Sequence, residues 1–192
     1  SNVQAIIDAC KAGHLKAVPC VVIGNNSGAP VLERARRAGI PYAHLSGQTH
    51  PAPEDLDQAV VEALEEHGVN LVVLAGYMKL LGPRTVSRFR GHILNTHPAL
   101  LPKFGGKGMY GLRVHEAVLD SGAGTTGVTI HQVDEDYDRG PIVAQRRVRV
   151  FEGDTPEALR DRVLKCEHEL YVETLQRISR GEIELDSPRS TP

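Results

Sequence analysis

Helical and strand-like hydrophobic patterns alternate along this chain, and that alternation limits its possible folds more than any other feature. Residues 70–75 (Asn-Leu-Val-Val-Leu-Ala) are almost wholly apolar, which is typical of a strand covered on both faces. Residues 53–67 before this run and residues 83–89 after it have the spacing of amphipathic helices. Alternating helices and buried strands predict an α/β fold with a mostly parallel central sheet flanked by helices.

The remaining patterns extend this order along the chain. Helices are expected at residues 1–10, at residues 30–38 before Gly39, and from Asp154 to about residue 180. Further strands are expected at residues 18–23 and 92–95. In the second half, residues 125–133 and 140–150 alternate polar and apolar side chains, so we expect them to pair as an antiparallel C-terminal part of the sheet.

Length, charge and cysteine content exclude several classes of protein. The 192 residues, 41% of them hydrophobic, predict a single domain over residues 1–186 followed by a polar tail at 187–192. A net charge of −2 gives no basic surface for nucleic acid. The three cysteines lack CxxC spacing, which argues against a disulfide framework or a zinc site. No apolar stretch approaches the ~20 residues of a membrane span, and we expect a soluble cytoplasmic protein without a signal peptide.

The strongest chemical signal is Asn95-Thr96-His97-Pro98, at the end of an expected strand. Alternation along a strand places Asn95 and His97 on the same side, and ligands of open parallel sheets bind beyond the carboxyl ends of the strands. An amide donor and an imidazole aimed at one carbonyl suit acyl-group transfer, because the amide stabilises an oxyanion and the imidazole moves protons. The alternative is that the two residues only end the strand.

A second signal is the acidic loop at residues 134–139, which ends in Gly140-Pro141. One carboxylate from this loop beside His97 would orient and charge the imidazole, whereas the alternative is a solvated turn. His131 stands two positions after Thr129 in a strand pattern, so we expect both to face one side and to support the site, or His131 to be a core histidine. No pair of histidines has the spacing of metal ligands, and we expect no metal.

Ser1 and Asn2 stand at the start of the first expected helix. Helix N-termini bind phosphate through their free N–H groups and the helix dipole. Helix capping explains these two residue types equally well.

Several segments, taken in order, resemble one family, the glycinamide ribonucleotide formyltransferases. They are residues 1–6, 32–35 (Leu-Glu-Arg-Ala), 74–78 (Leu-Ala-Gly-Tyr-Met), 94–102 (Leu-Asn-Thr-His-Pro-Ala-Leu-Leu-Pro), 138–141 (Asp-Arg-Gly-Pro) and 167–168 (Glu-His). The resemblance extends from residue 1 to about residue 181. It implies a Rossmann-like formyltransferase fold and transfer of the formyl group of 10-formyltetrahydrofolate to the amine of glycinamide ribonucleotide, in de novo purine biosynthesis. The folate is then a cosubstrate, and no metal is required.

The resemblance also assigns roles to single residues. Asn95, His97 and Asp138 match the catalytic residues. Ser1 and Asn2 match residues that bind the substrate phosphate, and Glu167 matches the acid that binds its ribose. The residues matched to the formyl-folate are Asn95, Met78, Lys79, Leu80, Leu81, Asp134, Glu135, Asp136 and Tyr137. The pterin pocket would be lined by Leu74, Val86 and Ile93. Residues 1–95 would form a phosphate-binding half and residues 96–186 a folate-binding half.

The sequence departs from this family at its start and in a few side chains. The family begins with an apolar strand and a Gly-x-Gly loop of about ten residues before the Ser-Asn pair, and these are missing here. Because that strand is central in the family's sheet, we expect an unpaired strand edge and a weaker grip on phosphate. Residues 104–111 are a glycine-rich variant of a segment that many members carry as Tyr-Pro-Gly. Pro53 and Leu164 also replace polar residues found near the ligands in some members.

Three alternative functions stay open at this point. A formyltetrahydrofolate hydrolase shares the Asn-x-His arrangement, although the Ser1-Asn2 pair favours a transferase. A methionyl-tRNA formyltransferase would carry an additional C-terminal domain and a basic face. A folate- or nucleotide-binding module without activity is the third alternative. A monomer and a homodimer are both compatible with the sequence.

Overall fold

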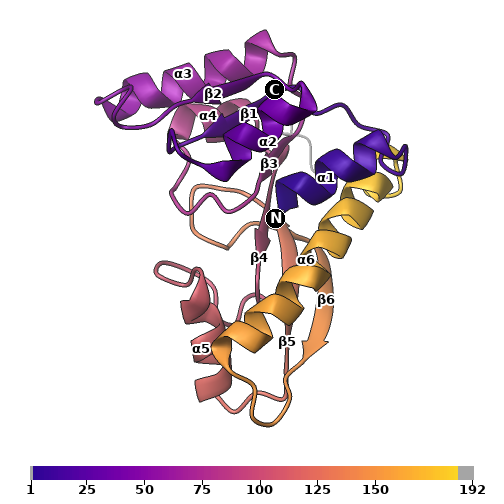
Figure 1. The fold of residues 1–192 in the computed structure, drawn as a ribbon. Coiled ribbons are helices and arrows are strands. Elements are labelled where there is room, and N and C mark those ends of the chain that lie inside the picture. The colour runs from indigo at the N-terminus through magenta and orange to yellow at the C-terminus, as the bar shows by residue number, and fades with distance from the viewer. Residues whose placement is uncertain (1, 186–192) are drawn as a thin grey trace, which may run out of the picture.

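Helices and strands alternate through residues 2–185, the part of the chain that the computed structural model describes (Figure 1). The elements in chain order are α1 (Asn2–Lys11), β1 (Val22–Gly24), α2 (Pro30–Ala38), β2 (Tyr42–His44), α3 (Pro53–Glu66), β3 (Val72–Leu74), α4 (Pro83–Arg88), β4 (Ile93–His97), α5 (Leu112–Asp120), β5 (Thr125–Gln132), β6 (Ile142–Arg149) and α6 (Pro156–Ser179). This order confirms the predicted α/β class.

The strands form two sheets rather than one. β1 and β2 pair in parallel, and a four-stranded sheet has the order β3-β4-β5-β6. Within it β3 and β4 are parallel, whereas β4, β5 and β6 are antiparallel neighbours, as the alternating second-half pattern predicted. Among residues 2–185, β1 pairs only with β2 and β3 pairs only with β4. Each of these two strands therefore has one unpaired edge, which agrees with the edge expected from the sequence.

The unpaired edges have a visible effect on burial. The apolar residues of β3, Val72–Leu74, are only half-buried, although their composition is typical of a strand covered on both faces. Val21 and Ile23 from β1 and its approach nevertheless pack in the same hydrophobic cluster as Val72 and Leu74. The two sheets thus lie against one another without sharing a ladder of hydrogen bonds.

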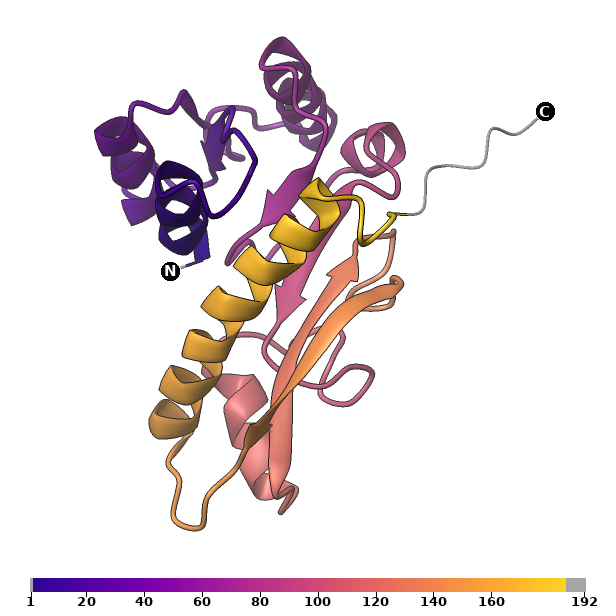
Figure 2. The ribbon, with the colours of Figure 1, turned by 90° about the vertical axis from the view of Figure 1, so that its right-hand side faces the viewer.

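The long helix α6 lies along the four-stranded sheet and builds the main core (Figure 2). Side chains from β4, β5, β6 and α6 form one buried cluster, which includes Leu94, Val128, Ile130, Val148, Leu159, Val163, Leu170, Tyr171 and Leu175. Tyr171 has no exposed surface, and its hydroxyl donates to the carbonyl oxygens of Leu74 at 3.1 Å and Leu94 at 3.0 Å. This one side chain therefore ties α6 to the two parallel strands β3 and β4.

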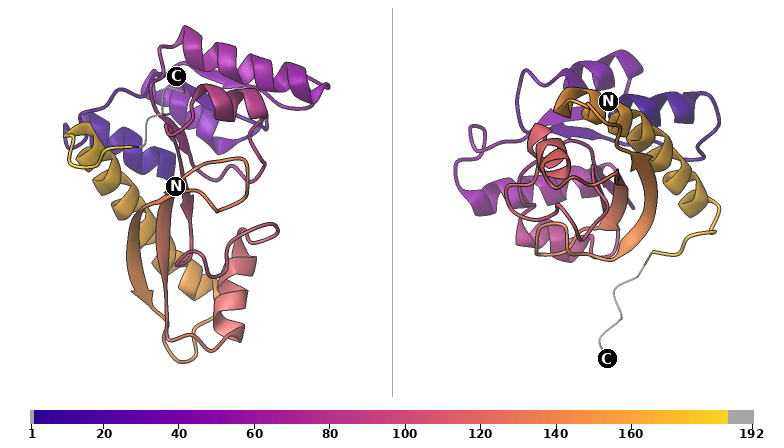
Figure 3. Two further views of the ribbon diagram at one scale, coloured as in Figure 1. Left: turned by 180° about the vertical axis from the view of Figure 1, so that it is seen from behind. Right: turned by 90° about the horizontal axis from the view of Figure 1, so that it is seen from below.

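Two segments converge on the other side of the sheet. Seen from behind (Figure 3, left), the loop between β5 and β6 and the segment before α5 lie on the same side of β4. The acidic loop follows β5 and the glycine-rich segment follows β4. Contacts of Asp138 with His97 and with the Gly106 N–H bring both segments to the part of β4 where Asn95 and His97 stand.

The structure corrects one expected strand and adds two elements that were not expected. The strand expected at residues 18–23 is Val22–Gly24, and Val18 is 81% exposed, because β1 has only the three-residue β2 to pair with. The strand β2 was not predicted, because its three residues are too few to show a pattern. The helix α5 was also not predicted, since it begins after Gly111 without a side-chain cap.

Other expectations concern membrane spans, the single domain and the polar tail. None of the helices in residues 2–185 combines the length and apolarity that crossing a bilayer requires. The single domain over residues 1–186 stays a prediction, and the polar tail at 187–192 lies outside the described residues.

Candidate active site

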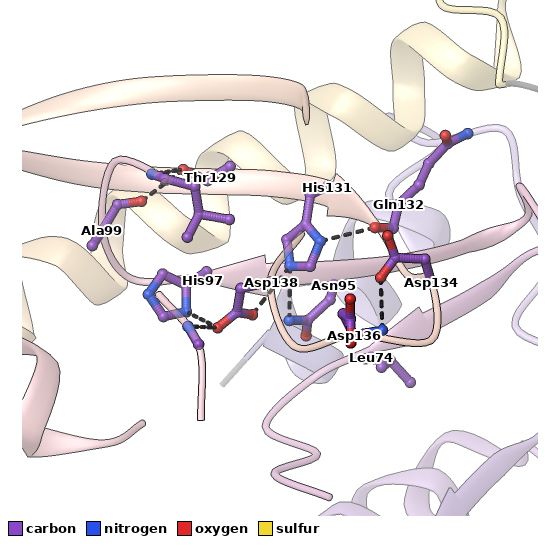
Figure 4. A network of polar contacts seen from close by, with 12 residues as sticks. Leu74, Asn95, His97, Ala99, Thr129, His131, Gln132, Asp134, Asp136 and Asp138 are labelled. Carbon is purple, nitrogen blue, oxygen red and sulfur yellow. Dashed lines mark hydrogen bonds and ion pairs between the residues drawn. The ribbon is translucent and has the colours of Figure 1, made fainter. Parts of the chain in front are cut away.

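β4 and β5 place four polar side chains on one face of the sheet (Figure 4). Asn95 is the register partner of His131, and His97 is the partner of Thr129. Directly opposed residues of an antiparallel pair share a face, and so do alternate residues of one strand. The structure thus confirms that Asn95 and His97 point to one side and that Thr129 and His131 join them.

Asp138 from the loop between β5 and β6 completes this group. Its Oδ2 lies 3.4 Å from His97 Nδ1, and its Oδ1 lies 3.4 Å from His131 Nε2. The backbone N–H of Gly106 donates to Oδ2 at 2.9 Å. The predicted carboxylate beside His97 is therefore Asp138, and it contacts both histidines.

The backbone around Asp138 is held in an uncommon conformation. Asp138 has a φ of 56°, in the left-handed region that non-glycine residues seldom adopt. At Gly140 a Cβ would lie 1.9 Å from the carbonyl oxygen of Gln132, so only glycine fits there. The close approach at Gly140 fixes the end of the loop and keeps the Asp138 carboxylate aimed at the histidines.

His97 meets an oxygen atom at each ring nitrogen. Nε2 donates to the carbonyl oxygen of Phe104 at 2.7 Å, while Nδ1 faces Asp138. Burial lowers the pKa of His97, whereas the Asp138 carboxylate and the Phe104 carbonyl oppose that shift. Each ring nitrogen therefore has an acceptor oxygen beside it, so that a proton on either nitrogen is stabilised.

The environment of Asp138 favours its charged form. Burial raises the pKa of this carboxyl, but the contacts with His131, the Gly106 N–H and His97 outweigh burial, so the pKa lies below its usual value. A carboxylate in this place stabilises positive charge on His97.

Thr129 supports the site from within the core. Its side chain has no exposed surface, and its hydroxyl donates to the Ala99 carbonyl at 2.6 Å. The same hydroxyl accepts from the Leu101 N–H at 3.0 Å and from Gln145 Nε2 at 2.8 Å. Thr129 therefore anchors the chain just after His97 and does not face the ligand space.

A cavity of about 460 Å³ lies over this group. The predicted residues that line it are Leu74, Met78, Lys79, Leu80, Leu81, Asn95, His97, His131, Asp136, Tyr137, Asp138 and Glu167. Asp134 and Glu135 do not line it: Asp134 accepts the N–H of Asp136, and Glu135 pairs with Arg90. Val86 and Ile93 are buried in the core instead of lining the cavity, which leaves Leu74 as the part of the expected pterin pocket that faces it.

Glu167 lines one side of the cavity and is bonded to Asn2, a buried residue that does not line it. Asn2 Nδ2 donates to Glu167 Oε1 at 2.8 Å. Burial raises the pKa of Glu167, and the bond from Asn2 opposes that shift. Within residues 2–185, the buried Asn2 Oδ1 has no hydrogen-bond partner. Ser1, the other residue expected at the phosphate, lies outside the described residues.

Sequence reasoning missed the part that the glycine-rich segment plays. Residues 106–111 line the cavity, and the backbone of Phe104 and Gly106 contacts His97 and Asp138. The only available signal was the run of glycines at 105, 106, 108 and 111, because backbone atoms carry the contacts. Within residues 2–185, no three His, Cys, Asp or Glu side chains are grouped so as to hold a metal ion.

Comparisons with known proteins point to one group. The family model described as formyl transferase matches residues 1–175. Phosphoribosylglycinamide formyltransferase from Escherichia coli is 39% identical over 171 residues, which cover 89% of this chain and 78% of that protein. The crystal structure of glycinamide ribonucleotide transformylase 1 from Symbiobacterium toebii superposes with a TM-score of 0.89 at 40% identity, covering 97% of this chain and 85% of that one.

Two further matches differ in length or in similarity. The chloroplastic phosphoribosylglycinamide formyltransferase of Arabidopsis thaliana is 45% identical over 91% of this chain, and the chain spans 60% of that protein's length. A formyltetrahydrofolate deformylase from Pseudomonas syringae superposes with a TM-score of 0.85 over 97% of this chain and 60% of that one, but at 23% identity it shares the fold alone.

Proposed function

The chain belongs to the formyl transferase family, and from this premise we propose that it transfers the formyl group of 10-formyltetrahydrofolate to the amine of glycinamide ribonucleotide. The observation that carries the proposal is the convergence of Asn95, His97 and Asp138 at the floor of one cavity. The relatives at 39% and 40% identity bear names of this activity. The reaction belongs to purine biosynthesis.

The chemistry begins with attack of the substrate amine on the formyl carbon. The carbonyl oxygen becomes an oxyanion, which the Asn95 N–H and His97 stabilise. His97 takes up the proton that the attacking nitrogen loses, while Asp138 stabilises the resulting imidazolium. The bond from the formyl carbon to the folate nitrogen then breaks, and that nitrogen receives the proton. The formyl group ends as an amide on the ribonucleotide.

The cavity walls divide between the two substrates in this proposal. Glu167, which lines the cavity and is bonded to Asn2, would accept from the ribose hydroxyls, and Asn2 stays expected at the phosphate. Ser1 at the phosphate stays a prediction. The folate would contact the loop at Met78, Lys79, Leu80 and Leu81, together with Asp136 and Tyr137. Backbone N–H and carbonyl groups of the glycine-rich segment are available on the facing wall.

A turnover assay separates transfer from the open alternatives. Consumption of 10-formyltetrahydrofolate is followed by absorbance with and without glycinamide ribonucleotide. Fast consumption only in the presence of the ribonucleotide supports the transferase. Equal consumption in its absence means a hydrolase, and no consumption in either case means a binding module.

Location and assembly are further expectations for this chain. We propose a cytoplasmic enzyme without a nucleic-acid partner, as the net charge of −2 and the cysteine spacing indicate. The Arabidopsis relative is named as chloroplastic, which applies to that protein. Sedimentation of the purified chain distinguishes a monomer from a homodimer.

A further inference from the structure

We propose that His131 is a positioning residue, which fixes the orientation of the Asn95 amide so that an N–H rather than the carbonyl oxygen meets the developing oxyanion. This inference rests on the proposed formyl transfer. It assigns His131 a role in turnover that acts entirely through Asn95, and it is derived from the hydrogen bonds on the two ring nitrogens.

The first step concerns the tautomer of His131. Nδ1 lies 2.9 Å from the carbonyl oxygen of Gln132 (Figure 4). A carbonyl oxygen only accepts, so Nδ1 must carry the proton. In the neutral ring Nε2 then has a lone pair and acts as an acceptor. Asp138 Oδ1 lies 3.4 Å from this nitrogen, beyond the usual hydrogen-bond range, whereas Asn95 Nδ2 lies at 3.1 Å. The side chain is 2% exposed, so water does not compete freely for either nitrogen.

The second step concerns the Asn95 amide. Asn95 Nδ2 lies 3.1 Å from His131 Nε2. Only the NH₂ end of the amide can bond to a lone pair, so Oδ1 must point away from His131. This is the one hydrogen bond that the Asn95 side chain makes within residues 2–185, and Asn95 lines the cavity. The second Nδ2 hydrogen is thereby left for the ligand.

The third step concerns how the backbone holds His131 in place. His131 is directly opposite Asn95 in the β4–β5 ladder, where paired side chains are close neighbours. The register of β5 with β6 shifts between Ile130 and His131: Ile130 pairs with Ala144 and His131 pairs with Ile142. Irregularities of this kind re-aim side chains and occur beside active sites.

Formyl transfer requires that an N–H of the Asn95 amide faces the oxyanion. Without a fixed acceptor at Nε2, the Asn95 amide can rotate and present Oδ1 to an oxyanion, which is repulsive. A misplaced donor costs turnover rather than substrate binding, because the oxyanion exists only after attack. Loss of the anchor should therefore lower kcat and leave both KM values nearly unchanged.

Two substitutions at His131 separate orientation of Asn95 from general support. His131→Asn retains a donor for the Gln132 carbonyl but no group at the Nε2 position. His131→Gln places an amide oxygen near the Nε2 position but gives up the bond to Gln132. We expect kcat of His131→Asn to fall roughly tenfold below that of His131→Gln, with each KM within about twofold of the parent chain. The reverse order would show that the bond to Gln132 matters instead, and would overturn the proposal. His92→Asn, outside the cavity lining, controls for the exchange itself.

A double-mutant cycle tests whether the effect passes through Asn95. In an Asn95→Ala background, His131→Asn should cause no further loss of kcat, because the group that it positions is gone. If the fold-losses in kcat of the two single variants multiply in the double variant, the proposal is overturned, since His131 would then act on the substrate or on Asp138 directly.

A spectroscopic readout keeps this proposal separate from the proposed function. ¹⁵N NMR of the labelled, ligand-free chain should show His131 with a protonated Nδ1 and an unprotonated Nε2. A protonated Nε2 in the neutral ring overturns the orientation argument even if formyl transfer is confirmed. If the spectrum is as expected and the chain transfers no formyl group, the proposed function has failed and His131 has no turnover to assist.

Discussion

At the scale of single residues, the centre is organised around oxygens that face His97. Asp138 and the Phe104 carbonyl each meet one ring nitrogen. Phe104 and Asp138 are also the two non-glycine residues of the described chain with positive φ, at 58° and 56°. Backbone strain of order 1 kcal/mol or more at each position is thus placed where it directs an oxygen to the histidine.

Removal of any catalytic side chain should reduce turnover far more than stability. We expect Asn95→Ala, His97→Ala and Asp138→Ala each to lower kcat by about two orders of magnitude or more, the usual scale for lost oxyanion or acid–base help. Steady-state kinetics with both substrates measures this, alongside thermal melting of each variant. Near-parental turnover of His97→Ala would rule out the mechanism.

The Asp138 carboxylate should be visible in the titration of His97. Burial lowers the pKa of His97, and the carboxylate raises it. Asp138→Asn removes only the opposing effect, so the pKa of His97 should fall further. NMR titration of the imidazole C–H signals in the parent chain and in Asp138→Asn gives the two values. An unchanged or higher pKa in the variant would mean that the carboxylate does not act on this ring.

At the scale of elements, α6 is joined to the parallel strands by the Tyr171 hydroxyl. Its bonds to the Leu74 and Leu94 carbonyls lie where water cannot replace them. We expect Tyr171→Phe to lower the free energy of unfolding by about 1–3 kcal/mol, the usual penalty for unsatisfied buried groups. Urea denaturation measures this, with Tyr42→Phe, at a 50% exposed position, as the control. Equal midpoints for the two variants would contradict this role.

Helix α5 contains a buried histidine that should make the fold sensitive to acid. His115 is 2% exposed, and its Nδ1 has no hydrogen-bond partner within residues 2–185. Burial, followed by the charges of Arg160 and His97, lowers its pKa to about 4 from 6.5. Between these two values the unfolded chain binds a proton that the folded chain does not. The neutral form of His115 therefore makes its full contribution to the free energy of unfolding above pH 6.5. That contribution, about 3 kcal/mol in total, is lost as the pH drops toward 4.

A substitution at this position tests the assignment. His115→Leu should flatten the decline in unfolding free energy between pH 6.5 and 4, as measured by urea denaturation at a series of pH values. A decline of the same steepness in His115→Leu would assign the acid sensitivity to other groups.

The elements also show which features a sequence can predict. The helix at Pro30–Ala38 and the pair β5–β6 were predictable because their periodicity is long and Gly39 ends the helix with a φ of 71°. α5 and β2 were not, because one lacks a capping side chain and the other has three residues. Asn95 and His97 were found because alternation on one strand places them together.

Contacts made by the backbone were beyond the reach of sequence reasoning. The Phe104 carbonyl on His97 and the Gly106 N–H on Asp138 depend on φ angles that their residue types do not specify. The Asn95–His131 bond depends on a cross-strand register that no single strand encodes. Tertiary pairing, rather than local pattern, decides these parts of the site.

At the scale of the whole molecule, the break between the two sheets is the main departure from a continuous α/β sheet. β1 and β3 each leave one edge without a strand partner among residues 2–185. Unpaired backbone groups are satisfied only by water at such an edge, and the apolar side chains of β3 stay half-buried.

A strand supplied at this break should stabilise the fold and improve binding of the ribonucleotide. We expect that fusing an apolar strand and a Gly-x-Gly turn ahead of Ser1 raises the melting temperature, because both open edges gain hydrogen bonds. The same fusion should tighten ribonucleotide binding more than folate binding, since helix N-termini and glycine turns bind phosphate and the folate loops begin after Leu74. Calorimetric titration and thermal melting test this, with a Gly/Ser extension of equal length as the control. Equal melting temperatures and affinities for the two fusions would contradict it.

The open edges also bear on how the protein behaves at high concentration. An exposed strand edge is a template for a strand from another molecule, and pairing of that kind is bimolecular. Slow growth of light scattering should therefore steepen with concentration, even far below the melting temperature, whereas unimolecular unfolding would not depend on concentration. Charged or proline substitutions in β3 are expected to slow this increase in light scattering. The storage life of the purified chain thus depends on Val72–Leu74, the strand with the unpaired edge.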